Sequence, residues 1–235
     1  MNMNNVYYLK KNMMKNLKEY IMEEIFDIDN NIDNVDEAVK EQIKQFLKKN
    51  FKNASSCKIS DKPNADGKYE VSGRYISTKN KKITSLTNGM FIWTNVDGDF
   101  SCWECKLLTS LEGAPKEVGG DFYCFGCKSL TSLEGAPQKV GRDFNCWGCT
   151  SLKSLEGAPK EVSGKFNCYS CALTSLEGAP EKVGGNFSCE TNVSLTSLEG
   201  APKEVGGNFR CGYCRGKFTE NDVKKVSNVK GKISI

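Results

Sequence analysis

Histidine is absent from this chain of 235 residues. Its absence excludes every catalytic arrangement in which an imidazole activates a serine or cysteine nucleophile. The chain also lacks a run of 18 apolar residues, and its first 30 residues lack the apolar segment and cleavage site of a secretory signal. We therefore predict no enzymatic activity, no membrane association and no secretion by a standard signal peptide.

Positive charge is scarce in the centre of the chain. The formal net charge is +4, yet residues 83–213 carry eleven basic and fifteen acidic side chains. A nucleic-acid groove needs positive charge concentrated on one extended face. The charge distribution therefore disfavours nucleic acid as a partner.

What the sequence does have is a repeat. A V-x-x-x-F/Y unit recurs in steps of 25, 22, 22, 22, 21 and 22 residues, beginning at Val71, Val96, Val118, Val140, Val162, Val183 and Val205. The segment LEGAP recurs in five of the units. Self-similarity at this period predicts a solenoid in which each unit buries its face against its neighbours.

The repeat resembles the leucine-rich repeat family. The family pattern LxxLxLxxN followed by xLxxL matches Phe122, Cys124, Cys127, Leu130 and Leu133, and LTSLxxxP resembles the compact bacterial and phage-encoded type. The resemblance covers residues 71 to about 217 and departs from the family in using Phe and Cys where Leu is usual. It implies a β-dominated solenoid of the α/β class, with one parallel strand per repeat of about 22 residues, an extended convex side and an N-terminal helical cap.

Alternation within the F-x-C segment predicts which side chains face the core. Neighbouring residues of a strand point to opposite sides, so Phe122 and Cys124 face inward and Tyr123 faces outward. On this interpretation, Gly119 and Gly120 supply the unrestricted backbone dihedrals for the turn into the strand.

Ten of the twelve cysteines form Cys-x-x-C pairs, at 102/105, 124/127, 146/149, 168/171 and 211/214. The spacing alone is typical of zinc ligands. However, Asn80 and Asn192 replace the second cysteine in two units, at the position where leucine-rich repeats have asparagine. We therefore interpret the thiols as buried packing groups and predict no cofactor. Zinc or an iron–sulfur cluster held by pairs from adjacent units, and disulfides, are the alternatives.

Function is expected on the outward strand positions, because the inward positions build the stack. In the first unit these positions are Arg74, Ile76 and Thr78. Further along, aromatic residues share one outward column and aspartates share the column beside it: Trp103, Phe125, Trp147 and Tyr169, and Asp99, Asp121 and Asp143. The rings either stabilise the ladder by stacking or bind a partner, and both roles are compatible. Together with Tyr123 and Arg210 they form the candidate site for a protein with a basic or aromatic surface.

The two ends differ from the repeats. A capping box at Asn34 and Glu37 predicts a helix that follows an earlier helix in residues 5–28, whose apolar face holds Leu17, Ile21, Ile25 and Ile28. We divide the chain into a helical N-terminal cap or docking segment (1–56), an entry segment with the first unit (57–82), the repeats (83–217) and a C-terminal cap (218–235). The C-terminal cap is expected to contain a short helix and a strand at residues 232–235.

Residues 14–27, MKNLKEYIMEEIFD, resemble the helical N-terminal segments of head-targeted proteins of large tailed phages. The sequence thus favours a non-enzymatic protein-binding leucine-rich-repeat module of bacterial or phage origin, located in the bacterial cytoplasm or within a virion. One alternative is a virion structural or internal protein docked by its N-terminal helices. The other is a metal-binding protein that uses the Cys-x-x-C pairs.

Overall fold

The computed structural model describes residues 32–235 of the chain, divided into a unit that ends at Gln42 and a unit from Ile43 to Ile235. Helix α2 (Ile32–Asn50) spans the division. The helix predicted to follow Asn34 is present as part of α2. The helix predicted for residues 5–28 lies outside the described residues.

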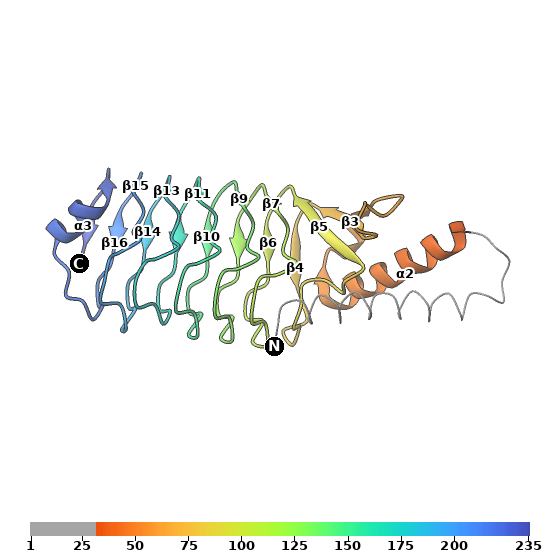
Figure 1. Cartoon of the computed structure of the whole chain (residues 1–235), viewed down its shortest axis with the longest axis horizontal. Coiled ribbons are helices and arrows are strands. Elements are labelled where there is room, and N and C mark those ends of the chain that lie inside the picture. Colours follow the sequence, from red (N-terminus) through yellow and green to blue (C-terminus); the bar gives the residue numbers. More distant parts are fainter. Residues whose placement is uncertain (1–31) are drawn as a thin grey trace. The chain divides into compact units, whose positions relative to one another are not determined.

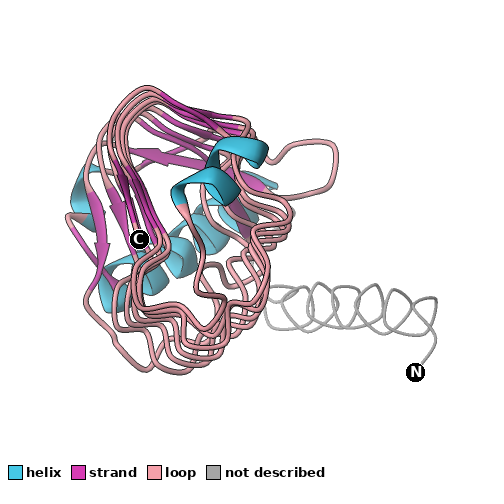
Figure 2. Cartoon of the chain, turned by 90° about the vertical axis from the view of Figure 1, so that its left-hand side faces the viewer, coloured by secondary structure: helices cyan, strands magenta, loops and turns pink. Residues whose placement is uncertain are grey.

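The second unit is a β-solenoid whose turns follow one another along the chain (Figures 1 and 2). Each turn contributes one short strand to each of two nine-stranded sheets. We call the first the phenylalanine sheet, with strands in the order β1 (Phe51–Lys52), β4 (Ile76–Thr78), β6 (Phe100–Ser101), β8 (Phe122–Tyr123), β10 (Phe144–Asn145), β12 (Phe166–Asn167), β14 (Phe187–Ser188), β16 (Phe209–Arg210) and β18 (Ile233–Ser234).

The second sheet, here the valine sheet, lies on the other side of the core. Its strands are β17 (Asn228–Val229), β15 (Glu204–Val205), β13 (Lys182–Val183), β11 (Glu161–Val162), β9 (Lys139–Val140), β7 (Glu117–Val118), β5 (Phe91–Val96), β3 (Tyr69–Gly73) and β2 (Lys58–Ile59). Pairing from turn to turn is parallel, and only the first pair of each sheet is antiparallel. The predicted β-dominated solenoid with a repeat of about 22 residues after an N-terminal helix is confirmed, although each turn has two strands instead of one.

Stacked phenylalanines form the centre of the core. The six rings are fully buried, and successive ring centroids are 5.0 to 5.8 Å apart, along Phe100, Phe122, Phe144, Phe166, Phe187 and Phe209. Columns of buried valine, leucine and cysteine run beside them. Each ring contacts the equivalent ring one repeat away. The regular repeat length therefore places these rings in one continuous stack at the centre of the core.

Gly119 and Gly141, which precede two of the phenylalanine strands, lie close to the backbone of the preceding turn. A Cβ on Gly119 would collide with the carbonyl oxygen of Asp97, and one on Gly141 with the carbonyl oxygen of Gly119. Neither glycine has a positive φ. The expectation that these glycines are needed for their dihedral freedom is therefore replaced by a steric reason.

The first turn departs from the predicted register. The pairing of β3 with β5 shifts between Val71 and Gly73, and Ile76 then pairs with Phe100. As a result Ile76 and Thr78 are buried, and Tyr75 is exposed. The prediction that Ile76 and Thr78 face outward is wrong, because a register shift of one residue exchanges the two faces of a strand.

The ends of the solenoid are closed differently. At the start, Phe46 of α2 packs against Phe51 and Phe91, and Ile43 and Leu47 are buried. A short 3₁₀ helix, η1 (Ala54–Ser56), follows β1. At the other end, helix α3 (Glu220–Val226) buries Val223 and leads into an eighth turn made of β17 and β18. The V-x-x-x-I spacing of Val229 and Ile233 continues the repeat, a signal that the sequence analysis missed.

Within residues 32–235, no helix combines the length and apolarity needed to cross a membrane.

Candidate binding face

The outer face of the phenylalanine sheet carries the predicted aromatic column. Trp103, Phe125 and Trp147 stack in succession, with ring centroids 5.6 and 5.3 Å apart and interplanar angles of 16° and 7°. Trp147 and Tyr169 are 41% and 39% exposed, whereas Trp103 and Phe125 are half-buried. Among the described residues, the ring contacts of this column end at Trp147. The structure thus brings three of the four rings into one stack and leaves the last two open to solvent.

Two asparagines hold the exposed rings in place through the backbone. The amide of Trp147 donates to Oδ1 of Asn145 at 3.2 Å, and the amide of Tyr169 donates to Oδ1 of Asn167 at 3.0 Å. These local side-chain contacts fix the bend where strand becomes turn. The exposed rings therefore extend from an ordered backbone.

Lys81 covers the first ring of the stack. Its Nζ lies 3.5 Å from the ring centroid of Trp103 and donates to the Trp103 carbonyl oxygen at 2.6 Å. Burial lowers the pKa of Lys81 from its ordinary value. Because Lys81 belongs to the preceding turn and Phe125 to the following turn, both faces of the Trp103 indole are occupied. Lys81 was not among the sequence candidates, since no local pattern connects it with Trp103.

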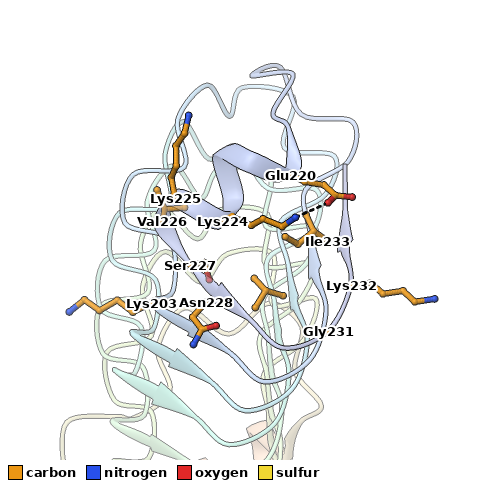
Figure 3. Close-up of a pocket in the computed structure, with 11 residues that line it drawn as sticks. Lys203, Glu220, Lys224, Lys225, Val226, Ser227, Asn228, Gly231, Lys232 and Ile233 are labelled. Carbon is orange, nitrogen blue, oxygen red and sulfur yellow. Dashed lines mark hydrogen bonds and ion pairs between the residues drawn. The ribbon is translucent and has the colours of Figure 1, made fainter.

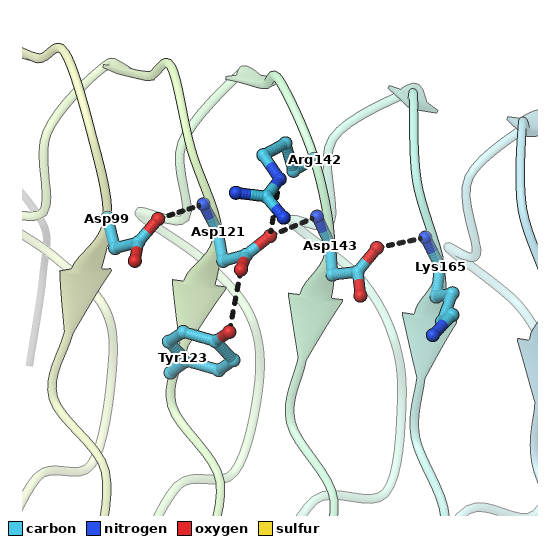
Figure 4. A network of polar contacts seen from close by, with 6 residues as sticks. All are labelled: Asp99, Asp121, Tyr123, Arg142, Asp143 and Lys165. Atoms are coloured by element: carbon cyan, nitrogen blue, oxygen red, sulfur yellow. Dashed lines mark hydrogen bonds and ion pairs between the residues drawn. The ribbon is translucent and has the colours of Figure 1, made fainter.

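The aspartate column forms a hydrogen-bonded ladder between turns (Figure 4). Oδ1 of Asp99 accepts the amide of Asp121 at 2.9 Å, Oδ1 of Asp121 accepts the amide of Asp143 at 2.9 Å, and Oδ1 of Asp143 accepts the amide of Lys165 at 2.7 Å. Each carboxylate therefore caps a backbone donor that the strands leave unpaired. This structural role was not foreseen from the sequence.

Asparagine performs the same task further along the column. Oδ1 of Asn186 accepts the amide of Asn208, and Oδ1 of Asn208 accepts the amide of Lys232, both at 2.8 Å. A neutral amide oxygen is thus sufficient for the ladder. The negative charge of Asp99, Asp121 and Asp143 exceeds what the fold needs.

Tyr123 and Arg210, the other two sequence candidates, have different surroundings. The Tyr123 hydroxyl donates to Oδ2 of Asp121 at 2.7 Å, while Nε of Arg142 lies 3.7 Å from Asp121 Oδ1 (Figure 4). Burial and the neighbouring carboxylates raise the pKa of Tyr123. Arg210 is exposed on β16, two strands beyond β12 and the turn that carries Tyr169. Tyr123 therefore joins the aspartate ladder, whereas Arg210 stands apart from the ring stack.

The outer face of the valine sheet has a contrasting composition. Its paired positions alternate in charge from turn to turn, along Glu117, Lys139, Glu161, Lys182 and Glu204. Nζ of Lys182 lies 3.8 Å from Oε2 of Glu204. Charges on this face compensate one another within the chain, as expected for a solvated surface. On the aromatic and acidic face Arg142 contacts Asp121, whereas Asp99 and Asp143 make no ion pair within residues 32–235.

The cysteines form two columns of thiols inside the turns, and all twelve are free. In the second column, four Sγ atoms donate to the backbone oxygen of the first-column cysteine one turn earlier, at 3.1 to 3.3 Å: Cys127 to Cys102, Cys149 to Cys124, Cys171 to Cys146 and Cys214 to Cys189. The fifth, Cys105, has its Sγ 3.1 Å from Oγ1 of Thr78. Burial raises the pKa of Cys124 and Cys168 well above its ordinary value. These two first-column thiols are therefore protonated at neutral pH, whereas hydrogen bonding with Cys146 and Cys189 lowers the pKa of Cys171 and Cys214.

Asn192 occupies the second thiol position in its turn. Its Nδ2 donates to the carbonyl oxygens of Cys168 and Cys189 at 2.9 and 2.8 Å, and its Oδ1 accepts the amide of Cys171 at 3.1 Å. The carbonyl of the first-column residue one turn earlier is thus the shared acceptor of cysteine and asparagine. Within residues 32–235, no group of three or more acidic, histidine or cysteine side chains is arranged to hold a metal ion.

A hollow of about 750 Å³ lies at the C-terminal end of the solenoid (Figure 3). Lys203, Lys225 and Lys232 point away from it, and Lys224 points to Glu220 (Figure 3). Three of these lysines pair with acidic neighbours at 3.1 to 3.2 Å, in Lys203–Glu181, Lys224–Glu220 and Lys225–Asp222. Strands β17 and β18 end the two sheets here. Lysines beside short edge strands prevent association between sheet edges, and this explains the basic character of the hollow.

Comparison of the chain with protein-family models, with curated proteins and with solved structures finds no match.

Proposed function

We propose that the outer face of the phenylalanine sheet is a protein-binding surface and that the chain acts as a non-enzymatic binding module. The observation that carries the proposal is the difference between the two outer faces. The valine sheet has charges that alternate and compensate one another. The phenylalanine sheet has exposed rings at Trp147 and Tyr169 beside a column of aspartates whose charge the ladder does not need.

The exposed rings suit the centre of an interface. Trp and Tyr are enriched among the residues that dominate binding energy, because they bury a large area at little conformational cost. Trp147 rests on Phe125, and Asn145 fixes its backbone, so its ring is held in place before a partner arrives. An ordered ring loses little freedom on binding.

The aspartate column defines the chemistry of the partner. Asp99, Asp121 and Asp143 follow one another in adjacent turns, so their fields add along the face. Complementary charge speeds association and selects the partner. We therefore expect a partner that presents basic and aromatic side chains.

We also propose that the repeats are of the leucine-rich type. Asn192 supports this assignment, because it binds the backbone of adjacent turns at the position where the family has asparagine. A bacterial or phage origin, and a place in a virion, stay predictions. The virion hypothesis depends on residues 14–27, which lie outside the described residues.

The test compares variants of the two outer faces. Full-length protein, the Trp147→Ala variant and the Lys139→Ala variant are used as baits at native expression, and captured proteins are quantified. We expect a protein that the full-length chain and Lys139→Ala retain equally and that Trp147→Ala loses. Equal capture by all three baits, with folding verified by circular dichroism, would contradict a binding role for this face.

A further inference from the structure

A pocket of about 370 Å³ opens on the outer face of the phenylalanine sheet at the first turns of the solenoid. Tyr75, which is 51% exposed, forms one wall, and Tyr123 and Phe125 form the opposite wall. Tyr75 faces this space because the register shift at Val71 and Gly73 turns it outward. The pocket is large enough for one long side chain of a partner.

Ser101 lines the pocket and is only 8% exposed, and its buried hydroxyl has no hydrogen-bond partner. Other residues of its outward column use their polar groups. Asn145 and Asn167 accept a backbone amide, Tyr123 donates to Asp121, and Ser188 donates to Glu190. A buried hydroxyl without a partner is costly. Its position at the pocket points to a ligand group that completes the hydrogen bond.

Asp99 supplies negative charge beside this hydroxyl. Its Oδ1 accepts the amide of Asp121, while Oδ2 makes no ion pair within residues 32–235. The nearby Lys81 directs its ammonium group to the ring and carbonyl oxygen of Trp103. The pocket therefore combines a carboxylate that makes no ion pair within residues 32–235, an unpartnered hydroxyl and two tyrosine rings.

We propose that this pocket binds an arginine side chain of the protein partner, which deepens and rests on the proposed function. The guanidinium group donates to the carboxylate of Asp99 and to the hydroxyl of Ser101, and the aliphatic stem packs against Tyr75 and Phe125. Arginine fits better than lysine because its planar group presents several donors to separate acceptors. Cation–π contact with Trp103 is not required, since both faces of that ring are occupied.

The direct test uses small probes of the same shape, one with a charged guanidinium group and one with a neutral urea group that has fewer donors. Nα-acetylarginine amide and Nα-acetylcitrulline amide are titrated into the full-length protein, and the three tryptophan indole N–H signals are followed by NMR. We expect the arginine probe to shift the Trp103 signal saturably, with the citrulline probe binding at least about tenfold more weakly. The signals of Trp93 in the core and of Trp147 outside the pocket should not move. Equal binding of both probes, an equal response to Nα-acetyllysine amide, or no saturable shift overturns the proposal.

Matched variants separate the pocket from the rest of the face. Asp99→Asn keeps an oxygen that accepts the amide of Asp121, so it removes the charge without breaking the ladder. It should lower the affinity for the arginine probe about tenfold. Asp143→Asn makes the same change outside the pocket and should leave probe binding unchanged. Ser101→Ala should weaken the probe while the protein stays folded. Equal effects of Asp99→Asn and Asp143→Asn count against the pocket.

The two proposals can fail separately. Trp147→Ala removes a ring that stacks on Phe125 but does not itself line the pocket, so it tests the binding face while every residue of the arginine site stays in place. If the arginine probe binds but Trp147→Ala captures as much protein as the full-length chain, the arginine pocket is supported and the protein-binding face is rejected. If Trp147→Ala loses the captured protein but the arginine probe does not bind, the protein-binding face is supported and the arginine pocket is rejected.

Discussion

The carboxylate of Asp121 accepts the backbone amide of Asp143, one turn further along the solenoid, at 2.9 Å. Asn186 and Asn208 are related in the same way, at 2.8 Å. The ladder therefore needs an oxygen atom at this position in each turn, and charge is a separate property. This separation allows structure and binding to be tested independently.

Replacement of Asp143 by asparagine should leave stability nearly unchanged. The amide oxygen still accepts the amide of Lys165, so we expect a change of less than about 0.5 kcal/mol in the free energy of unfolding. Asp143→Ala removes the acceptor and should cost about 1 kcal/mol. Urea denaturation measures both. Equal losses in the two variants would show that charge, and not the oxygen, stabilises the ladder.

Removal of the stacked rings should separate stability from binding. Trp103 is held between Lys81 and Phe125, so Trp103→Ala should lower the free energy of unfolding by about 2 kcal/mol or more. Trp147 is 41% exposed, so Trp147→Ala should lower the free energy of unfolding less than Trp103→Ala does, but should weaken partner binding more. Thermal denaturation and partner titration give the two rankings. If Trp103→Ala causes the larger loss both of stability and of binding, the rings have only a structural role.

Alanine at two glycines of the same turn should have unequal effects. A Cβ at Gly141 meets the backbone oxygen of Gly119, so Gly141→Ala should cost about 2 kcal/mol or more. Gly148 has a φ of +70°, but a Cβ there would meet no atom closer than 3.9 Å, and Glu104 and Ser170 adopt similar angles in equivalent turns. Gly148→Ala should therefore cost about 1 kcal/mol. A larger loss for Gly148→Ala in urea denaturation would contradict the steric explanation.

Substitution of Asn192 should show that cysteine and asparagine serve one purpose. Asn192→Ala leaves the carbonyl oxygens of Cys168 and Cys189 without this donor and should cost about 2 kcal/mol. Asn192→Cys should restore part of that loss, because Cys149 and Cys171 donate to the equivalent carbonyl in their turns. Chemical denaturation compares the three proteins. No recovery with cysteine would refute the equivalence.

The thiols should be free of disulfides and metal, and Cys57 should be slow to react at neutral pH. Denatured protein should release twelve titratable thiols and contain well under one zinc or iron per chain. In the native state only Cys57 and Cys214 are half-buried. Burial raises the pKa of Cys57 to about 11, so its thiolate fraction and labelling rate should rise about tenfold per unit between pH 7 and pH 10. Mass spectrometry of labelled peptides measures the rates. Rapid labelling of Cys57 at neutral pH, or two bound metal ions, would contradict this prediction.

Much of the fold follows from the sequence because the repeat is regular. The 22-residue spacing aligns equivalent residues, and period-two alternation separates Phe122 and Cys124 from Tyr123. The replacement of cysteine by asparagine at residue 192 identified a buried polar position, and the structure places Asn192 there with its hydrogen bonds complete. These features depend on residues close in the sequence and on the equivalent residues of the adjacent repeat, so the sequence pattern alone predicts them.

Other features were decided only by the tertiary structure. The inward position of Ile76 depends on how β3 pairs with β5, and the steric need for Gly119 depends on the backbone of Asp97. The ladder role of Asp121 and the pocket between Tyr75 and Phe125 likewise involve residues from different turns. In the sequence such residues are separated by 22 positions or more. Their contacts form only when turns stack, because stacking brings together backbone donors, carbonyl oxygens and side chains that local patterns do not relate.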